Sequence, residues 1–283
     1  MKTGIIDVGG GMRGIYGAGI MDRLMDKGIQ FDCYIGVSAG AANVVSYMAE
    51  QQGRNYKFYT DYAFRSEYMG MKNYIQTGNY INLDYIYSEL SNHDKEDPLN
   101  YSEVQRKFDQ GKRIVVIATD VETGKPVYFS NEDMGQDNYD VIKASSCVPL
   151  VNNPYEINGK KYFDGGLSDS VPVEKAFEMG CDKVVLILTK PRDYYRETDT
   201  DKKLSSLIEI RYPNVAKALS IRGDLYNFCL DKAKDMEKEG KVLILAPDDI
   251  GGMKTLTRKK EDMDMLYWKG VEDALQVLPF LGK

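Results

Sequence analysis

The residues most suggestive of chemistry are Gly36-Val37-Ser38-Ala39-Gly40, which match the pattern G-x-S-x-G. In enzymes that use this pattern, the serine sits on a sharp, strained turn between a strand and a helix, with its hydroxyl clear of the backbone. Small residues two positions before and after it avoid a clash, and the following helix directs its positive end at the reacting oxygen. The pattern predicts Ser38 as a nucleophile, although a turn of small residues is the simpler alternative.

A serine nucleophile needs a base. The single histidine, His93, lies in a polar, charged segment, which predicts an exposed surface position. The base is then expected to be a carboxylate or a lysine. Asp164 is the best carboxylate candidate, because it ends a short aromatic strand and precedes Gly165 and Gly166. Functional residues gather at such strand ends in parallel sheets. The alternative is a turn aspartate that binds only its own backbone.

A glycine-rich turn, Gly9-Gly10-Gly11-Met12-Arg13-Gly14, connects the first expected strand to the first helix. Its backbone N–H groups suit either an oxyanion hole or the pyrophosphate of a dinucleotide. Asp32, roughly 20 residues on, makes a dinucleotide-dependent oxidoreductase a real alternative. However, Asp32 falls at the start of the second expected strand, and this alternative leaves the serine turn unused.

The elements that must position these residues follow a strand-turn-helix order twice within the first fifty residues. This order predicts a parallel sheet with helical crossovers. Residues 54–110 are rich in tyrosine and predict helices and loops with no clear strand. Strands are expected at 3–8, 31–35, 113–119, 127–130, 162–163, 183–189 and 241–246. Helices are expected at 15–25, 41–51, 139–145, 172–179, 204–239 with a break before Pro213, and 259–278.

Composition restricts the partners and the compartment. The 283 residues carry a formal net charge of −6, which argues against nucleic-acid binding and weakly against tight docking on anionic membranes. The four cysteines form no C-x-x-C pair, so we expect buried free thiols and no zinc site. We expect no metal and no cofactor. The N-terminus lacks an apolar signal region, and no apolar run is long enough to span a bilayer, so a cytoplasmic protein is expected.

Four blocks, in this order, resemble the patatin-like phospholipases. They are the glycine-rich turn with its Arg13, the serine turn 36–40, Ala144-Ser145-Ser146-Cys147-Val148-Pro149, and Asp164-Gly165-Gly166. The resemblance covers about residues 4–190. It implies a three-layer α/β/α fold with a mainly parallel central sheet, which makes residues 1–190 a catalytic domain. Residues 191–283 resemble a mostly helical extension found in one bacterial branch, expected to pack on or complete the same domain.

The resemblance also implies roles. Ser38 is the nucleophile and Asp164 the general base, with no histidine required. The glycine-rich turn, with Gly10, Gly11 and Met12 as N–H donors, forms the oxyanion hole, and the block around Ser145 supports the fold. The implied activity is hydrolysis of carboxylic esters of lipids, with a lipid or ester substrate. The aromatic side chains between Tyr56 and Tyr80 suggest an acyl channel or a cap in transient contact with a membrane surface, and core packing is the simpler alternative. A non-catalytic lipid-binding module with the same fold is a further alternative. Nothing in the sequence indicates an oligomeric state.

Overall fold

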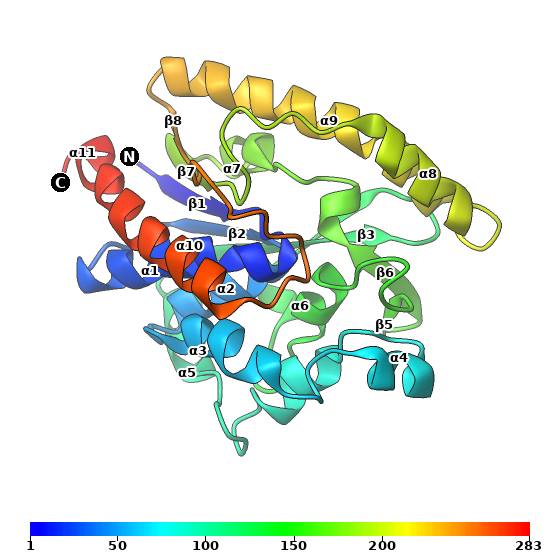
Figure 1. Ribbon diagram of the computed structural model, residues 1–283. Helices are drawn as coiled ribbons and strands as arrows, with labels where there is room; N and C mark the ends of the chain where they lie inside the picture. The colour runs from blue at the N-terminus through cyan, green and yellow to red at the C-terminus, as the bar shows by residue number, and fades with distance from the viewer.

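The computed structural model describes residues 1–283 and is built on a central sheet of eight strands (Figure 1). The strand order is β5-β6-β3-β2-β1-β7-β8, and β4 pairs with β3. Strands β3, β2, β1, β7 and β8 are parallel to one another. Strands β4 and β6 are antiparallel to β3, and β5 is antiparallel to β6. The strands are β1 (Thr3–Asp7), β2 (Cys33–Val37), β3 (Arg113–Asp120), β4 (Pro126–Phe129), β5 (Tyr155–Ile157), β6 (Lys160–Asp164), β7 (Lys183–Ile187) and β8 (Val242–Leu245).

Helices cover both faces of the sheet. Because side chains alternate along a strand, Ile5 packs into the core shared with α1, α2 and α10, while Ile6 packs into the core shared with α7 and α9. The three-layer α/β/α fold with a mainly parallel sheet is therefore confirmed. The α-helices are α1 (Ile15–Asp26), α2 (Ala39–Met48), α3 (Arg54–Thr60), α4 (Met71–Thr77), α5 (Tyr101–Asp109), α6 (Asp140–Ser145), α7 (Val173–Glu178), α8 (Thr198–Ile208), α9 (Pro213–Lys238), α10 (Lys260–Asp273) and α11 (Val277–Leu281).

The last third of the chain packs closely on the rest. Strand β8 extends the sheet beside β7, and α10 lies along α1 (Figure 1). These two helices approach so closely that a Cβ at Gly19 would lie 2.1 Å from the Tyr267 carbonyl oxygen, and one at Gly270 the same distance from that of Tyr16. Glycine is required at both positions because any side chain would separate the helices.

The tyrosine-rich segment 54–110 forms helices and loops and contributes no strand to the sheet. It includes α3, α4 and α5, which lie beyond α2 on one side of the molecule (Figure 1). None of the helices is long and apolar enough to cross a bilayer.

Candidate active site

Ser38 occupies a strained turn between β2 and α2. Its φ of 56° and ψ of −133° lie in a region that a residue with a side chain rarely adopts. A Cβ at Gly36 would lie 2.4 Å from the Ala41 Cα, and one at Gly40 would lie 2.2 Å from the Asp7 carbonyl oxygen. Both flanking glycines are therefore sterically required. The turn leaves the Ser38 side chain half-buried and directed at the two cavities described below.

The end of α6 holds this turn in place. The Ser38 N–H donates to Ser145 Oγ at 2.9 Å, and the Ser145 hydroxyl donates in turn to the Ile117 carbonyl of β3 at 2.6 Å. Two residues further on, the Cys147 carbonyl accepts from the Asp164 N–H at 2.8 Å. The segment 145–147 thus contacts the serine turn and the aspartate turn together. Its supporting role was expected, but the sequence did not indicate that it joins these two turns.

Strand β3 brings Ser38 and Asp164 together. It is eight residues long, and β4 pairs with its residues 116–119 along one edge. A strand has only two edges, and β4 occupies one of them. Strand β2 pairs with residues 113–117 and β6 pairs with residues 118–120, so these two strands lie end to end along the other edge. Val37 is opposite Ile117, and Asp164 is opposite Ala118. The carboxyl ends of β2 and β6 therefore meet, and both side chains line one cavity.

Asp164 is a buried carboxylate at the end of β6, with only 7% of its surface exposed. Burial raises the pKa of its side chain, while the Ser38 hydroxyl, the Gly166 N–H and the positive charge of Arg222 oppose the rise. Asp164 Oδ1 accepts from the Gly166 N–H at 2.8 Å. The Ser38 hydroxyl lies close to the Asp164 carboxylate but does not form a hydrogen bond with it in this structure. Such contacts often tighten only when substrate binds.

The glycine-rich turn adjoins Ser38, since a Cβ at Gly9 would lie 2.3 Å from the Val37 carbonyl oxygen. The N–H groups of Gly10 and Gly11 have no acceptor, as an oxyanion hole requires. In contrast to the expectation for Met12, its N–H donates to the Thr255 carbonyl at 2.8 Å. The Gly9 N–H donates to Asp7 Oδ1 at 2.8 Å. Two of the expected donors are thus free in this structure.

Arg13 and Gly14 anchor the glycine-rich turn. The buried Arg13 side chain donates from Nε to the Thr189 carbonyl at 3.2 Å and from one terminal nitrogen to Thr255 Oγ1 at 3.5 Å. Thr189 in turn donates to the Gly9 carbonyl. The Gly14 carbonyl accepts from Asn43 Nδ2 at 2.8 Å.

Asp7, which the sequence analysis did not single out, lies completely buried beneath the turn. It accepts from the Gly9 N–H and from Asn43 Nδ2, each at 2.8 Å. Burial raises its pKa to about 6, although these two hydrogen bonds oppose the rise. The available signal was a charged residue at the end of an apolar strand and directly before the glycines. Asp7 positions the turn and lines neither cavity beside Ser38.

We expect the stability difference between the wild type and Asp7→Asn to vary with pH. Because the folded pKa of Asp7 is raised from 3.8 to about 6, its contribution is greatest below 3.8 and is lost as the pH rises to about 6. A shift of this size corresponds to roughly 3 kcal/mol. Urea unfolding of both proteins between about pH 4 and pH 7 measures the difference. A difference that stays constant over this range would contradict the assignment.

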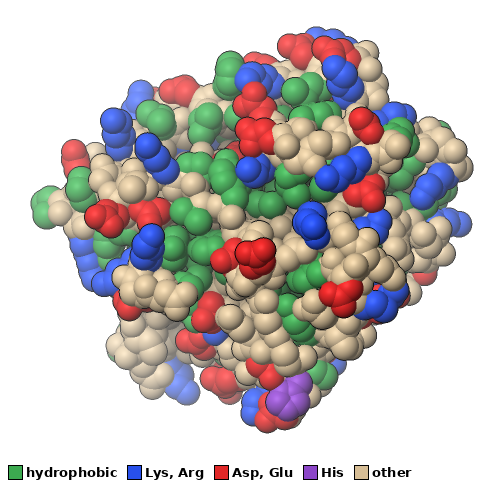
Figure 2. Space-filling model, turned by 180° about the vertical axis from the view of Figure 1, so that it is seen from behind, with side chains coloured by type: hydrophobic (Ala, Val, Ile, Leu, Met, Phe, Trp, Pro, Cys, Tyr) green, Lys and Arg blue, Asp and Glu red, His purple; other side chains and the backbone are tan.

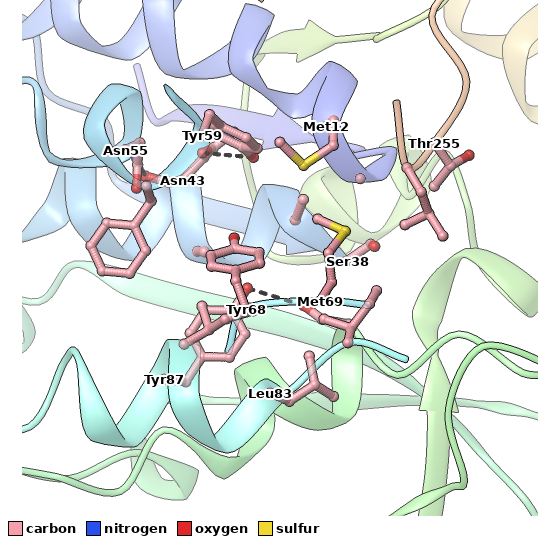
Figure 3. A pocket seen from close by; sticks show the side chains of 18 of the residues that line it. Met12, Ser38, Asn43, Asn55, Tyr59, Tyr68, Met69, Leu83, Tyr87 and Thr255 are labelled. Atoms are coloured by element: carbon pink, nitrogen blue, oxygen red, sulfur yellow. Dashed lines mark hydrogen bonds between the residues drawn. The ribbon is translucent and has the colours of Figure 1, made fainter. Parts of the chain in front are cut away.

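An apolar pocket opens on one side of Ser38 (Figure 3). It encloses about 730 Å³ including its mouth, and 13 of its 20 lining residues are hydrophobic. This largely hydrophobic lining is typical of a site for an apolar small molecule. Segment 54–110 supplies much of the wall, including Phe58, Tyr59, Tyr68, Leu83 and Tyr87. Some tyrosines of that segment thus line a pocket, while Tyr62 is core and Tyr74 is exposed.

A second, more polar cavity also borders Ser38. It includes the glycine-rich turn, Asp164, Thr189 and Lys190 from the segment after β7, and residues from α8 and α9. Ser38 lines both cavities, so a bound ester would have different surroundings for its acyl and alcohol parts.

Two candidate residues lie away from this site. His93 is exposed, as expected, and its Nδ1 contacts Asp137 Oδ2 at 2.5 Å (purple in Figure 2). Asp32 precedes β2, binds the Thr3 N–H at 2.8 Å and pairs with Lys112 at 3.0 Å. Since β1 and β2 are parallel, Asp32 lies at the opposite end of the sheet from the glycine-rich turn. It therefore cannot bind a ribose next to that turn. The four cysteines are buried and free.

The chain is thus a three-layer α/β protein with a strained serine between a strand and a helix. The patatin-like phospholipase family model matches residues 8–177, which is more than half of the chain, and the chain belongs to this family. A domain of unknown function, DUF6363, matches residues 212–283.

Two curated relatives are similar to this chain. The uncharacterized protein YjjU of Escherichia coli (strain K12) is 33% identical over 196 residues, which is 69% of this chain and 54% of that protein. The probable lipid hydrolase 463L of Invertebrate iridescent virus 6 is 23% identical over 190 residues, which is 60% of this chain and 61% of that protein. The chain thus spans little more than half the length of these relatives.

Proposed function

We propose that the protein is a lipid acyl hydrolase that cleaves carboxylic esters through a Ser38–Asp164 dyad. The observation that carries this proposal is the end-to-end meeting of β2 and β6 on β3, which sets a strained serine beside a buried carboxylate. Family membership and the similarity to a probable lipid hydrolase support lipid hydrolysis.

In the proposed first step, Asp164 accepts the Ser38 hydroxyl proton as the serine oxygen attacks the ester carbonyl. The N–H groups of Gly10 and Gly11 stabilise the resulting oxyanion. The carbonyl re-forms, and Asp164 gives its proton to the alcohol as the alcohol leaves. In the second step, Asp164 takes a proton from water, the hydroxide attacks the acyl-enzyme, and the fatty acid leaves as the proton returns to Ser38. The raised pKa of Asp164 suits a group that must both accept and return a proton.

The apolar pocket is proposed to hold the acyl chain. Ser38 lines this pocket together with aromatic and aliphatic side chains (Figure 3). We also propose transient contact with lipid aggregates. Exposed apolar side chains surround a shallow pocket beside the polar cavity, and they would gain apolar contact at a lipid surface. They are Tyr74, Leu150 and Leu207.

Labelling with a fluorophosphonate probe tests the nucleophile. We expect the wild type to be labelled and Ser38→Ala to show no labelling, because the probe forms a covalent bond with an activated serine oxygen. Ser206→Ala, which changes an exposed serine of α8, is the matched control and should label as the wild type does. Labelling that persists in Ser38→Ala would falsify the assignment. A wild type that is folded but never labelled would favour a non-catalytic lipid-binding module.

A further inference from the structure

The chain between β8 and α10 crosses the active site as a strap, residues 246–259 (orange between β8 and α10 in Figure 1). Thr255 and Leu256 of this strap line both the apolar pocket and the polar cavity beside Ser38. The strap lies within the region matched by DUF6363, residues 212–283. A region without an assigned function therefore forms part of the wall around the proposed nucleophile.

The strap holds one end of the glycine-rich turn. The Met12 N–H donates to the Thr255 carbonyl at 2.8 Å, and this is the only hydrogen bond that joins the backbone of residues 10–12 to a distant part of the chain. The contact is close, because a Cβ at Gly11 would lie 2.2 Å from the Thr255 carbonyl oxygen. At the other end of the turn, the Gly9 N–H donates to Asp7 Oδ1. The two unpaired donors, those of residues 10 and 11, lie between these attachments.

The turn needs both attachments because its glycines restrict the backbone very little. Gly9, Gly10 and Gly11 have φ angles of 65°, 120° and 61°, and glycine loses more conformational freedom on folding than any other residue. An oxyanion hole is effective only when its donors are oriented before the charge develops. A turn held at Gly9 alone would allow the N–H groups of Gly10 and Gly11 to reorient.

A tight turn within the strap presents the Thr255 carbonyl to Met12. Thr255 and Leu256 are the two central residues of this tight turn, which two hydrogen bonds close. The Thr257 N–H donates to the Lys254 carbonyl at 3.1 Å, and the Lys254 N–H donates to Thr257 Oγ1 at 3.0 Å. The Thr257 side chain therefore fixes the residue that holds the glycine-rich turn, although Thr257 itself lines neither cavity.

The strap is attached to the rest of the molecule on both sides of its tight turn. Before the turn, Met253 is buried in the main core, and Leu256 within the turn packs against the same core. After the turn, Arg258 Nη1 donates to the Ala63 carbonyl of the tyrosine-rich segment at 2.8 Å. The Thr255 carbonyl thus has a fixed position relative to both walls of the apolar pocket.

We propose that the strap positions the oxyanion hole, with Thr255 and Thr257 as positioning residues, so that the region matched by DUF6363 is an integral part of the active site. This inference rests on the proposed function, because an oxyanion forms only if Ser38 attacks an ester carbonyl. Thr255 acts through its backbone carbonyl and does not touch the reacting atoms. The strap is therefore expected to stabilise the transition state more than it stabilises bound substrate.

Thr257→Val tests this role at a position outside both cavities. Valine has the shape of threonine but cannot accept from the Lys254 N–H, so the tight turn loosens. We expect kcat/KM for p-nitrophenyl butyrate to fall about fivefold, the usual effect of losing one hydrogen bond. Thr257→Ser keeps the hydroxyl and should retain most of the activity. Thr123→Val is the matched control, because Thr123 Oγ1 accepts from the Lys125 N–H in an exposed turn outside both cavities, and it should keep the wild-type value.

A pair of inhibitors distinguishes positioning of the oxyanion hole from a general loss of structure. An alkyl trifluoromethyl ketone forms a tetrahedral, anionic adduct with a serine nucleophile, whereas the corresponding alcohol has the same chain and forms no adduct. In Thr257→Val the ketone should bind about fivefold more weakly and the alcohol as in the wild type. Equal weakening of both compounds, or an unchanged kcat/KM, would overturn the positioning role. A faster variant would show that the strap restrains the turn, and would overturn it too.

Hydrogen exchange separates this inference from the catalytic proposal. The Met12 amide should exchange faster in Thr257→Val than in the wild type, because its acceptor is held less firmly. Unchanged exchange at Met12 would contradict the role of the strap even in an active enzyme. Faster exchange combined with a wild type that hydrolyses no ester would contradict the catalytic proposal, while supporting the attachment of the glycine-rich turn to the strap.

Discussion

An Asp164→Asn enzyme is expected to hydrolyse a short-chain ester about a thousandfold more slowly than the wild type at neutral pH. The proposed mechanism assigns every proton transfer to this carboxylate, and a positioned general base contributes between about a hundredfold and ten-thousandfold. Asparagine has nearly the same shape and keeps an oxygen that can accept from the Gly166 N–H, but it cannot take the Ser38 proton. The measurement is kcat/KM for p-nitrophenyl butyrate.

The same variant should fold at least as stably as the wild type at neutral pH. Burial raises the folded pKa of Asp164 above 3.8, so its contribution to stability is greatest below 3.8 and declines as the pH rises through the folded pKa. At neutral pH the ionised carboxylate therefore costs stability, and asparagine removes that cost. Thermal unfolding provides the control. An inactive variant with a lower unfolding temperature would indicate a structural role instead.

The pH profile of the wild type gives a second readout of the same group. Because the base must be ionised to accept a proton, kcat/KM should fall on the acid side through the pKa of Asp164, which lies above that of an ordinary aspartate. Nearly full activity of Asp164→Asn, or an acid limb at the ordinary aspartate value, would contradict the assignment of Asp164 as the base.

Local patterns in the sequence predict most of the fold. The apolar runs at 113–119, 183–189 and 241–246 correspond to β3, β7 and β8, and the break before Pro213 separates α8 from α9. The second strand is displaced, because β2 begins at Cys33 and continues to Val37, directly before the nucleophile. Strand β5 was not predicted, since its three residues are partly exposed and too short to show an alternating pattern.

The relation between Ser38 and Asp164 required the tertiary structure. The sequence placed each at a strand end, but the meeting of the two ends depends on β3 being long enough to pair with β2 and then β6. That pairing is non-local, and no pattern within either segment specifies it. For the same reason the contact of Thr255 with the Met12 N–H could not be predicted.

The C-terminal segment is proposed to belong to the same folding unit as residues 1–190. Its strand β8 covers the edge of β7, and an uncovered parallel edge strand exposes unpaired backbone groups. Its helix α10 covers α1, where Tyr16 Oη donates to Asp273 Oδ2 at 2.8 Å. Removal of the segment would expose both surfaces.

Narrowing the apolar pocket should have a large effect that depends on acyl chain length. Ala42 lies on α2 one turn after Ser38, and it lines the pocket. Residues four apart share one face of a helix, so a larger side chain at position 42 would occupy the space next to the nucleophile. We expect Ala42→Phe to reduce kcat/KM for a decanoyl ester about a hundredfold, which corresponds to the upper part of the usual cost of overpacking.

The comparison across chain lengths makes this result specific to the pocket. Acetyl esters need little of the apolar pocket, so their hydrolysis by Ala42→Phe should change far less than that of decanoyl esters. Ala42→Ser adds little volume at the same site and should keep the wild-type chain-length profile. If Ala42→Phe slows acetyl and decanoyl esters equally, the substitution has disturbed the Ser38 turn. If Ala42→Phe hydrolyses the decanoyl ester as fast as the wild type does, the acyl chain lies outside the pocket lined by segment 54–110.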